Sequence, residues 1–319
     1  MHLALGIDVS KAKLHLALIT AADKVRHKTC ANSPAGFEDL RAWLHRHGAE
    51  QVHACLEATG PYGDAIALYL ADAGHVVSVV NPARIHAYAR AQQLRVKTDR
   101  TDAALIARFC AREQPAAWTP PPLELRHLQV LVRRLDALIG MHTQELNRLE
   151  VATDPVLQAS IRTVRDTLAA QIAELKARIA AHIDQHPGLR AQRDLLASIP
   201  GIGASTAAVL LAELFCRAFT TARQAAAYAG LTPRIRESGQ WRGQARLSRC
   251  GPARLRKALY LPALAALRYN PAIAALRQRL RARGKPPMLI VGAAMRHLVH
   301  LAFGVLKSGR AFDPHYLKA

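Results

Sequence analysis

Three consecutive prolines, Pro120–Pro122, divide the chain into two parts with different hydrophobic patterns. Proline lacks a backbone N–H and fixes φ near about −65°, so this run forms a stiff, extended linker. Before the linker, short apolar runs alternate with segments of helical spacing. After it, apolar residues recur mainly at three- and four-residue steps. We therefore expect an α/β region over residues 1–118, followed by a helical remainder.

The first region contains strand and helix patterns in alternation. The segments with strand character are His2–Ile7, Leu14–Ile19, Val52–Leu56 and His75–Val80. The segments with helical spacing are Phe37–His47, Asp64–Ala73 and Asp102–Arg112. The first two strands, separated by a short polar turn, predict a hairpin. Strands that alternate with helices predict a central sheet with helices on its faces.

The second part of the chain divides again into two regions. From Leu123 to about Ile183 the spacing predicts two long helices, in a hairpin or coiled coil that is interrupted near Asp154-Pro155. Beyond Pro187 we expect an all-helical region. The predicted domains are thus residues 1–118, 119–186 and 187–319.

The charge of the chain is concentrated at its C-terminal end. The 319 residues carry 44 Lys and Arg against 23 Asp and Glu, a net charge of +21. Residues 217–319 contain 20 basic and only 2 acidic side chains, whereas residues 119–216 are balanced at 10 and 10. A compact region this basic repels itself unless it faces a polyanion, so DNA, RNA or both are the expected partners. A membrane surface fits less well, because no basic amphipathic helix is backed by aromatic anchors.

The cysteines and the N-terminus predict a soluble cytoplasmic protein. Five cysteines are scattered singly without CxxC spacing, which argues against a disulfide scaffold and a zinc knuckle. No secretory pattern precedes the first strand, and we expect no apolar run of membrane-spanning length.

Four carboxylates of the first region form a candidate metal site. Asp8 and Glu57 each end a predicted strand, and Asp99 and Asp102 lie three residues apart at the start of a predicted helix. Acids at strand ends gather at the edge of an α/β sheet where active sites form. Converging carboxylates suit Mg²⁺, and two such ions roughly 4 Å apart can assist a phosphoryl transfer. The alternative, that these are surface acids or helix caps, has about equal weight on spacing alone.

Two motifs in the last region indicate nucleic-acid binding. Ile199-Pro-Gly-Ile-Gly203 has the form of a helix-hairpin-helix, in which Gly201 and Gly203 let the backbone approach a phosphate. A plain helix–helix turn is the less favoured alternative. Ser238 lies in a loop-like stretch among four arginines, Arg234, Arg236, Arg242 and Arg246. Composition alone favours a turn serine among phosphate-binding arginines over a nucleophile toward phosphorus.

Two further groups of basic residues have the pattern of solvated helix faces that follow a nucleic-acid backbone. The first group is Arg254, Arg256 and Lys257, and the second runs from Arg277 to Arg283.

Seven motifs occur in a fixed order along nearly the whole chain. They are Gly6-Ile-Asp-Val-Ser-Lys11, Leu56-Glu-Ala-Thr-Gly60, Asn81-Pro82, Lys97-Thr-Asp-Arg-Thr-Asp-Ala103, Ile199-Pro-Gly-Ile-Gly203, Ala229-Gly-Leu-Thr-Pro233 and Glu237-Ser-Gly239. This pattern resembles the DEDD transposases of insertion sequences, the insertion-sequence-one-hundred-ten family, described as bridge-RNA-guided recombinases.

The resemblance implies a fold and a mechanism. The first domain would be RuvC-like, with an RNase H fold, and Asp8, Glu57, Asp99 and Asp102 would bind Mg²⁺. Ser238 would be the nucleophile that forms a phosphoserine link to DNA, which reverses the interpretation from composition. A structured bridge RNA would pair with donor and target DNA, and the central helices would hold a homodimer or homotetramer together. Base pairing would then read the sequence, which agrees with a basic surface poor in aromatic residues.

Two other functions remain as alternatives. A RuvC-like, structure-selective nuclease would use water in place of Ser238. A non-catalytic nucleic-acid-binding protein would need neither the serine nor the acids.

Overall fold

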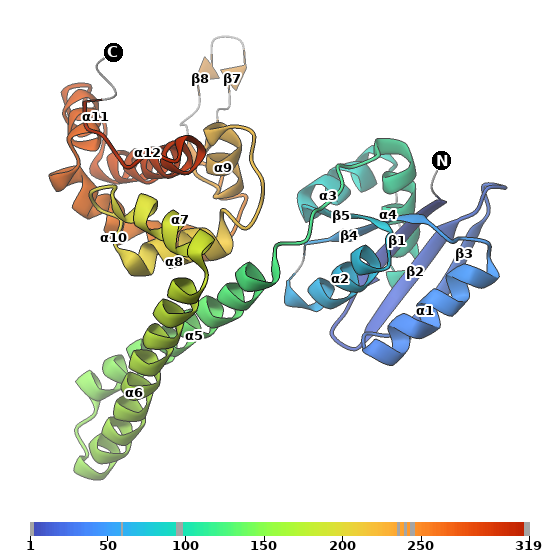
Figure 1. The fold of residues 1–319 in the computed structure, drawn as a ribbon, viewed down its shortest axis with the longest axis horizontal. Helices are drawn as coiled ribbons and strands as arrows, with labels where there is room; N and C mark the ends of the chain where they lie inside the picture. The colour runs from blue at the N-terminus through green and yellow to red at the C-terminus, as the bar shows by residue number, and fades with distance from the viewer. Residues whose placement is uncertain are drawn as a thin grey trace. The chain divides into compact units, whose positions relative to one another are not determined.

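The computed structural model describes residues 3–58, 60–93, 98–234, 237–238, 241–242 and 246–315. The chain forms two compact units, residues 1–120 and 121–319, and the boundary between them along the chain falls within the proline run (Figure 1). Each unit has its own hydrophobic core.

A five-stranded mixed sheet forms the centre of the N-terminal unit. Its strands are β1 (Leu3–Val9), β2 (Lys13–Ile19), β3 (Val25–Ala31), β4 (Val52–Glu57) and β5 (Val76–Val80). Their order is β3-β2-β1-β4-β5; β1 and β2 pair antiparallel, as do β2 and β3, whereas β1 and β4, and β4 and β5, pair parallel. This confirms the predicted α/β region and the hairpin at its start. β3 was not predicted, because it is an edge strand with a polar sequence in which only Cys30 is buried.

Helices cover both faces of this sheet. They are α1 (Pro34–Arg46), the short 3₁₀ helix η1 (Pro61–Gly63), α2 (Asp64–Asp72), α3 (Pro82–Ala91) and α4 (Asp99–Glu113). Side chains of α1 and α2 pack with Leu5 and Ile7 of β1 on one face. Side chains of α3 and α4 pack with Ala4 and Cys55 on the other. Alternate residues of each strand therefore belong to different cores.

The second unit is helical apart from four two-residue strands. Its helices are α5 (Leu123–Val151), α6 (Pro155–Gln185), α7 (Pro187–Ala197), α8 (Ala204–Glu213), α9 (Ala222–Tyr228), α10 (Ala253–Tyr269), α11 (Pro271–Ala282) and α12 (Pro287–Ser308). The strands are β6 (Pro233–Arg234), β7 (Glu237–Ser238), β8 (Trp241–Arg242) and β9 (Arg246–Leu247). α5 and α6 form a long antiparallel pair (Figure 1). Near one end of this pair, Leu128 and Ile183 join the core of the C-terminal helices.

α12 is the central helix of that core. It is the one helix among the described residues that is long and apolar enough to cross a membrane, so the expectation of no such run was wrong. Half of its most apolar window is buried inside the unit. Leu298, Val299 and Ala302 are buried in the same core as Leu259 and Ala263 of α10. The apolar sequence of α12 is explained by this packing.

A buried carboxylate joins three helices of the second unit. The side chain of Glu213 in α8 is 6% exposed and accepts hydrogen bonds from Arg133 of α5 at 2.9 Å and Arg254 of α10 at 3.0 Å. Asp136 of α5 also pairs with Arg254, at 3.2 Å, and with Lys257, at 2.8 Å.

These contacts correct one prediction about the basic residues of α10. Arg254 and Lys257 do not form a free solvated face, because they pair with acids far away in the sequence. Arg256 donates to the carbonyl of Gly251 at 2.8 Å. All three side chains thus stabilise the unit itself.

Replacing Glu213 with alanine will destabilise the second unit. Breaking a buried ion pair costs about 3–5 kcal/mol, and partial exposure of both arginines reduces the expected loss to about 2–3 kcal/mol. Chemical denaturation followed by circular dichroism measures the change. The control, Asp166→Ala, removes the partner of Arg165 from an exposed pair and should cost under about 0.5 kcal/mol. Equal stability of the two variants would contradict the role given to Glu213.

A candidate active site at the edge of the N-terminal sheet

Two of the predicted acids lie side by side on neighbouring parallel strands. Asp8 is the penultimate residue of β1, and Glu57 is the last residue of β4. The pairing of Ile7 with Leu56 places Asp8 and Glu57 at the next position along both strands. Cross-strand neighbours in this register point to the same face of a sheet. Both side chains are half-buried.

A glycine determines which helix covers this face. Gly6 precedes Asp8 by two residues, so both point to the same side of β1. A Cβ atom at Gly6 would lie 2.1 Å from the carbonyl oxygen of Ala103 and 2.3 Å from the amide nitrogen of Ala107. The backbone of α4 therefore crosses β1 at this point. Asp8 and Glu57 point to the same side of the sheet as α4.

The other two predicted acids lie in the first turn of α4. Asp99 and Asp102 are close to the positive end of the helix dipole, which favours negative charge. Thr98 is the N-cap, and it forms a reciprocal capping box with Thr101: the Thr98 amide donates to Thr101 Oγ1 at 2.8 Å, and the Thr101 amide donates to Thr98 Oγ1 at 3.2 Å. Neither aspartate is therefore the cap, and the alternative interpretation of these acids as N-caps was wrong.

His15 joins the site and was missed in the sequence. It lies directly opposite Asp8 on β2, and its Nε2 is 3.2 Å from Oδ2 of Asp99. Its Nδ1 is 3.3 Å from the hydroxyl oxygen of Thr29 on β3. His15 lies between the buried Leu14 and Leu16. This alternation places it on the same face as Asp8 and could have revealed it.

Asn32 fixes the two loops that follow the strand acids. Its side-chain amide donates to the carbonyls of Ser10 and Tyr62, both at 3.0 Å. Ser10 is two residues beyond Asp8, and Tyr62 follows Glu57 by five residues. One side chain therefore connects both loops at the site.

Asp8 and Glu57 lie on the face of the sheet that α4 covers, and Asp99 and Asp102 lie in the first turn of α4. The carboxylate oxygens of all four are the hard donors that Mg²⁺ prefers. Among the residues that the structure describes, no group of three or more His, Cys, Asp or Glu side chains is close enough to hold a single metal ion. The donor type fits Mg²⁺, but the described side chains do not form a compact ligand group.

Ser238 lies far from the four acids in the sequence, in one of the short strands of the second unit. It is exposed and pairs in β7 with Trp241 of β8. Arg234 of β6 and Arg246 of β9, both exposed, are partners in the adjoining ladder. Arg236 lies outside the described residues, as does the side chain of Arg242.

The two glycines of the predicted hairpin have different surroundings. Gly201 has φ +105°, and a Cβ atom there would lie 2.9 Å from the Pro262 carbonyl of α10. Close packing therefore requires glycine at position 201. Gly203 is the N-cap of α8, has open space around it and provides no side-chain cap. Its position leaves room for a ligand at the start of α8.

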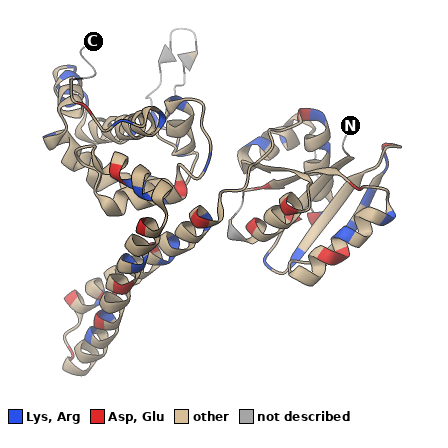
Figure 2. Cartoon of the chain, viewed as in Figure 1, with Lys and Arg blue, Asp and Glu red and all other residues tan. Residues whose placement is uncertain are grey.

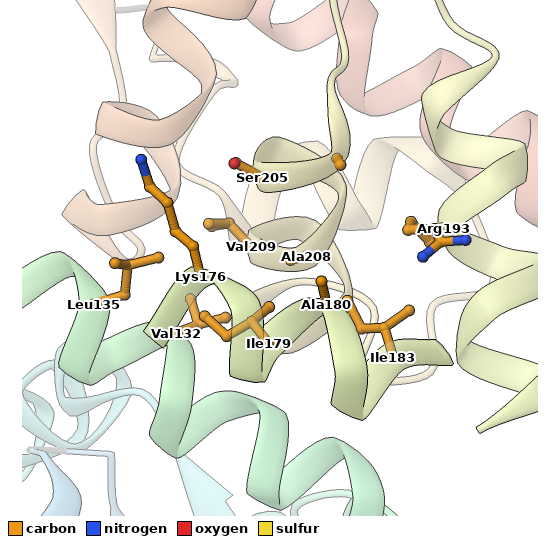
Figure 3. A pocket seen from close by; sticks show the side chains of 11 residues that line it. Val132, Leu135, Lys176, Ile179, Ala180, Ile183, Arg193, Ser205, Ala208 and Val209 are labelled. Carbon is orange, nitrogen blue, oxygen red and sulfur yellow. The ribbon is translucent and has the colours of Figure 1, made fainter. Parts of the chain in front are cut away.

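A pocket opens beside the start of α8 (Figure 3). Ser205 and Val209 of α8 line it together with Lys176 of α6 and Arg193 of α7. Arg193 pairs with Asp184 and Asp194. Lys176 is exposed, so this cation is available beside the amides of the first turn of α8.

Comparison with known proteins decides the family. Residues 5–156 match a family model described as "Transposase" (DEDD_Tnp_IS110), and residues 193–278 match "Transposase IS116/IS110/IS902 family". The pilin gene-inverting proteins of Moraxella bovis and Moraxella lacunata are each 33% identical over 314 residues, which cover 97% of both chains. The chain belongs to the IS110 family of transposases.

As a member of this family, the chain is a DNA recombinase, as the resemblance carried by the seven motifs predicted. An insertion element IS110 protein of Streptomyces coelicolor is 32% identical over 160 residues, 50% of this chain and 38% of its own length. The first family match contains the four acids, and the second contains Ser238, Gly201 and Gly203.

Replacing Gly6 with alanine will displace α4 and destabilise the N-terminal unit. The added methyl would overlap backbone atoms of α4, and we expect a loss of at least about 3 kcal/mol in the free energy of unfolding. Denaturant titration measures this loss. The control is Gly140→Ala in α5, where nothing lies within 4 Å of the added Cβ. It should gain up to about 1 kcal/mol, because alanine has the higher helix propensity. Unchanged stability of Gly6→Ala would disprove the close approach.

Proposed function

We propose that this transposase cuts and rejoins DNA with two groups of residues. Asp8, Glu57, Asp99 and Asp102 would bind two Mg²⁺ ions, and Ser238 would attack the DNA. The observation that carries the proposal is that α4, which begins with Asp99 and Asp102, packs closely on β1 at Gly6, on the face that carries Asp8 and Glu57. The unit would be RuvC-like, with an RNase H fold, and its mixed five-stranded sheet supports this assignment.

The carboxylates would concentrate divalent cations at one edge of the sheet. Mg²⁺ would stabilise the negative charge that develops on phosphate oxygens during strand cleavage. Asp8 and Glu57 extend from rigid strands, so they would provide fixed ligands. Asp99 and Asp102 start a helix whose position depends on Gly6. His15 would hold the carboxylate of Asp99 before a metal competes for it.

Ser238 would act by transesterification. Its Oγ would form a bond to a DNA phosphorus, the bond from that phosphorus to the leaving deoxyribose oxygen would break, and the serine proton would pass to solvent. A hydroxyl end of a second strand would then attack the phosphoserine and release the serine. The energy of the phosphodiester is conserved in this sequence, so the strands can rejoin. The nearby Arg234 and Arg246, together with Arg236 and Arg242, would neutralise phosphate charge.

The turn before α8 would bind a DNA or RNA phosphate as a helix-hairpin-helix. Open space at Gly203, free amides in the first turn of α8 and the Lys176 side chain support this role. Gly201 would permit the turn through its packing against α10. Such contacts bind the backbone and carry no sequence information.

The long α5–α6 pair would hold a homodimer or homotetramer together as a coiled coil. Its far end exposes large apolar side chains, with Val151 and Val156 at 77% and 79% exposed. Met141, Leu146 and Val164 are also exposed on these helices. Burial of such side chains against a second copy would remove apolar surface from water. A bridge RNA that pairs with donor and target DNA would supply the sequence specificity.

Inversion of a DNA segment is a second candidate reaction. It is favoured by the two full-length relatives, which are named as gene-inverting proteins. Inversion and excision need the same cleavage and rejoining steps and differ in the relative orientation of the two sites. A nuclease that uses water, and a protein that only binds, are the alternatives, and neither would form the rejoined products that the experiment below measures.

Excision in cells tests the proposed chemistry. The gene, with its native flanking DNA, is placed on a plasmid, and circular element junctions and inverted segments are quantified by sequencing. We expect products from the wild type and at least a 100-fold loss in both Ser238→Ala and Asp8→Asn. The first variant removes the proposed nucleophile, and the second removes a proposed Mg²⁺ ligand. The control, Ser160→Ala on the exposed surface of α6, should match the wild type.

Other outcomes would contradict parts of the proposal. Products from Ser238→Ala at the wild-type level would show that Ser238 is not the nucleophile. Products from Asp8→Asn at the wild-type level would remove the carboxylate site from the reaction.

A further inference from the structure

α11 carries a dense group of cations that has no acidic counterpart. Arg277, Arg279, Arg281 and Arg283, with Lys285 in the following loop, are all exposed. No Asp or Glu occurs in the sequence between Glu237 and Asp313. Among the described residues, none of the ion pairs involves these five cations, in contrast to Arg254 and Lys257. Figure 2 shows mixed charges along α5 and α6, and basic residues without acids on α11.

The arginines lie on both flanks of the helix. Ile273 is buried in the core, and Leu280 packs against the same core, so they define the inward side of α11. With about 3.6 residues per turn, Arg277 and Arg281 fall on one flank, and Arg279 and Arg283 on the other. The outward side between the flanks contains small or uncharged residues, namely Ala275, Gln278 and Ala282, all of which are exposed.

The positive field of this group reaches the neighbouring helix. Burial, and after it the positive charge of Arg279, lowers the pKa of His297 in α12. No ion pair among the described residues joins Arg279 to an acid, so its charge is available to an external anion.

This arrangement matches a duplex with one phosphate backbone on each side of the helix. The major groove of B-DNA is about 12 Å wide and admits an α-helix, whereas the major groove of A-form RNA is deep and narrow. An outward side of alanines allows α11 to approach the base edges, and the two arginine flanks then reach the opposite strands. We propose that α11 inserts into the major groove of duplex DNA and grips both backbones. Gln278 would face the base edges, where a glutamine can pair with adenine.

The proposal rests on DNA as the substrate but not on the cleavage chemistry. The four acids and Ser238 are outside α11. Variants of those residues should therefore keep this binding, so the groove contact and the reaction can fail separately.

Binding of the full-length chain to a fluorescent 30-base-pair DNA duplex of mixed sequence tests the contact. The variants R277Q/R281Q and R279Q/R283Q each remove one flank. We expect each to weaken binding at least tenfold at about 0.1 M salt and to reduce the slope of log affinity against log salt by about 2, since each lost phosphate contact removes about 0.9. The control R162Q/R190Q changes exposed arginines of α6 and α7 and should leave both values within twofold.

Two further measurements identify the groove and the type of duplex. Dimethyl sulfate methylates guanine N7 in the major groove, so the wild type should protect guanines that become reactive in both flank variants. An RNA duplex of the same sequence should bind more weakly and show no dependence on either flank. Three results would each overturn the proposal. The flank variants could lose as much affinity for the RNA duplex as for the DNA duplex, they could protect guanine N7 as the wild type does, or they could bind the DNA duplex with unchanged affinity. S238A should bind the DNA duplex as the wild type does.

Discussion

The contact between β1 and α4 determines the candidate active site. Gly6 has no side chain, so the backbone of α4 can pass directly over β1 at Ala103 and Ala107. The start of α4 then lies over the face that carries Asp8 and Glu57. A larger residue at position 6 would separate the helix acids from the strand acids. The placement of four carboxylates thus depends on one close backbone approach.

The second unit uses its basic residues in two ways. Arg133, Arg254 and Lys257 neutralise acids of the same unit and join α5, α8 and α10. Among the described residues, the cations of α11 form no such ion pair, either with acids near them in the sequence or with distant ones. The net charge of +21 therefore divides into a structural share and a share that is available to a polyanion.

Sequence patterns predicted the elements that bury apolar residues. The strands that contain Leu5, Ile7 and Leu56 were found because burial on both faces of the sheet leaves a continuous apolar run in the sequence. β3 was missed because only Cys30 is buried in it, and α12 was not recognised as a helix of membrane-spanning length. The four acids were found from their positions at strand and helix ends.

Contacts between distant residues could not be predicted in this way. His15 contacts Asp99 across 84 positions of sequence, and Lys257 contacts Asp136 across 121. Neither contact follows from local spacing, because each depends on how the elements pack. The sequence also did not show that Gly201 packs closely against α10 whereas Gly203 has open space around it.

The most direct test of the account is whether the four acids bind Mg²⁺. Calorimetric titration of the full-length chain with MgCl₂ should show binding that weakens at least tenfold in Asp8→Asn and in Glu57→Gln. The control Asp72→Asn, at the exposed end of α2, should bind as the wild type does. Identical Mg²⁺ binding in all four proteins would contradict the central claim that these carboxylates form one metal site.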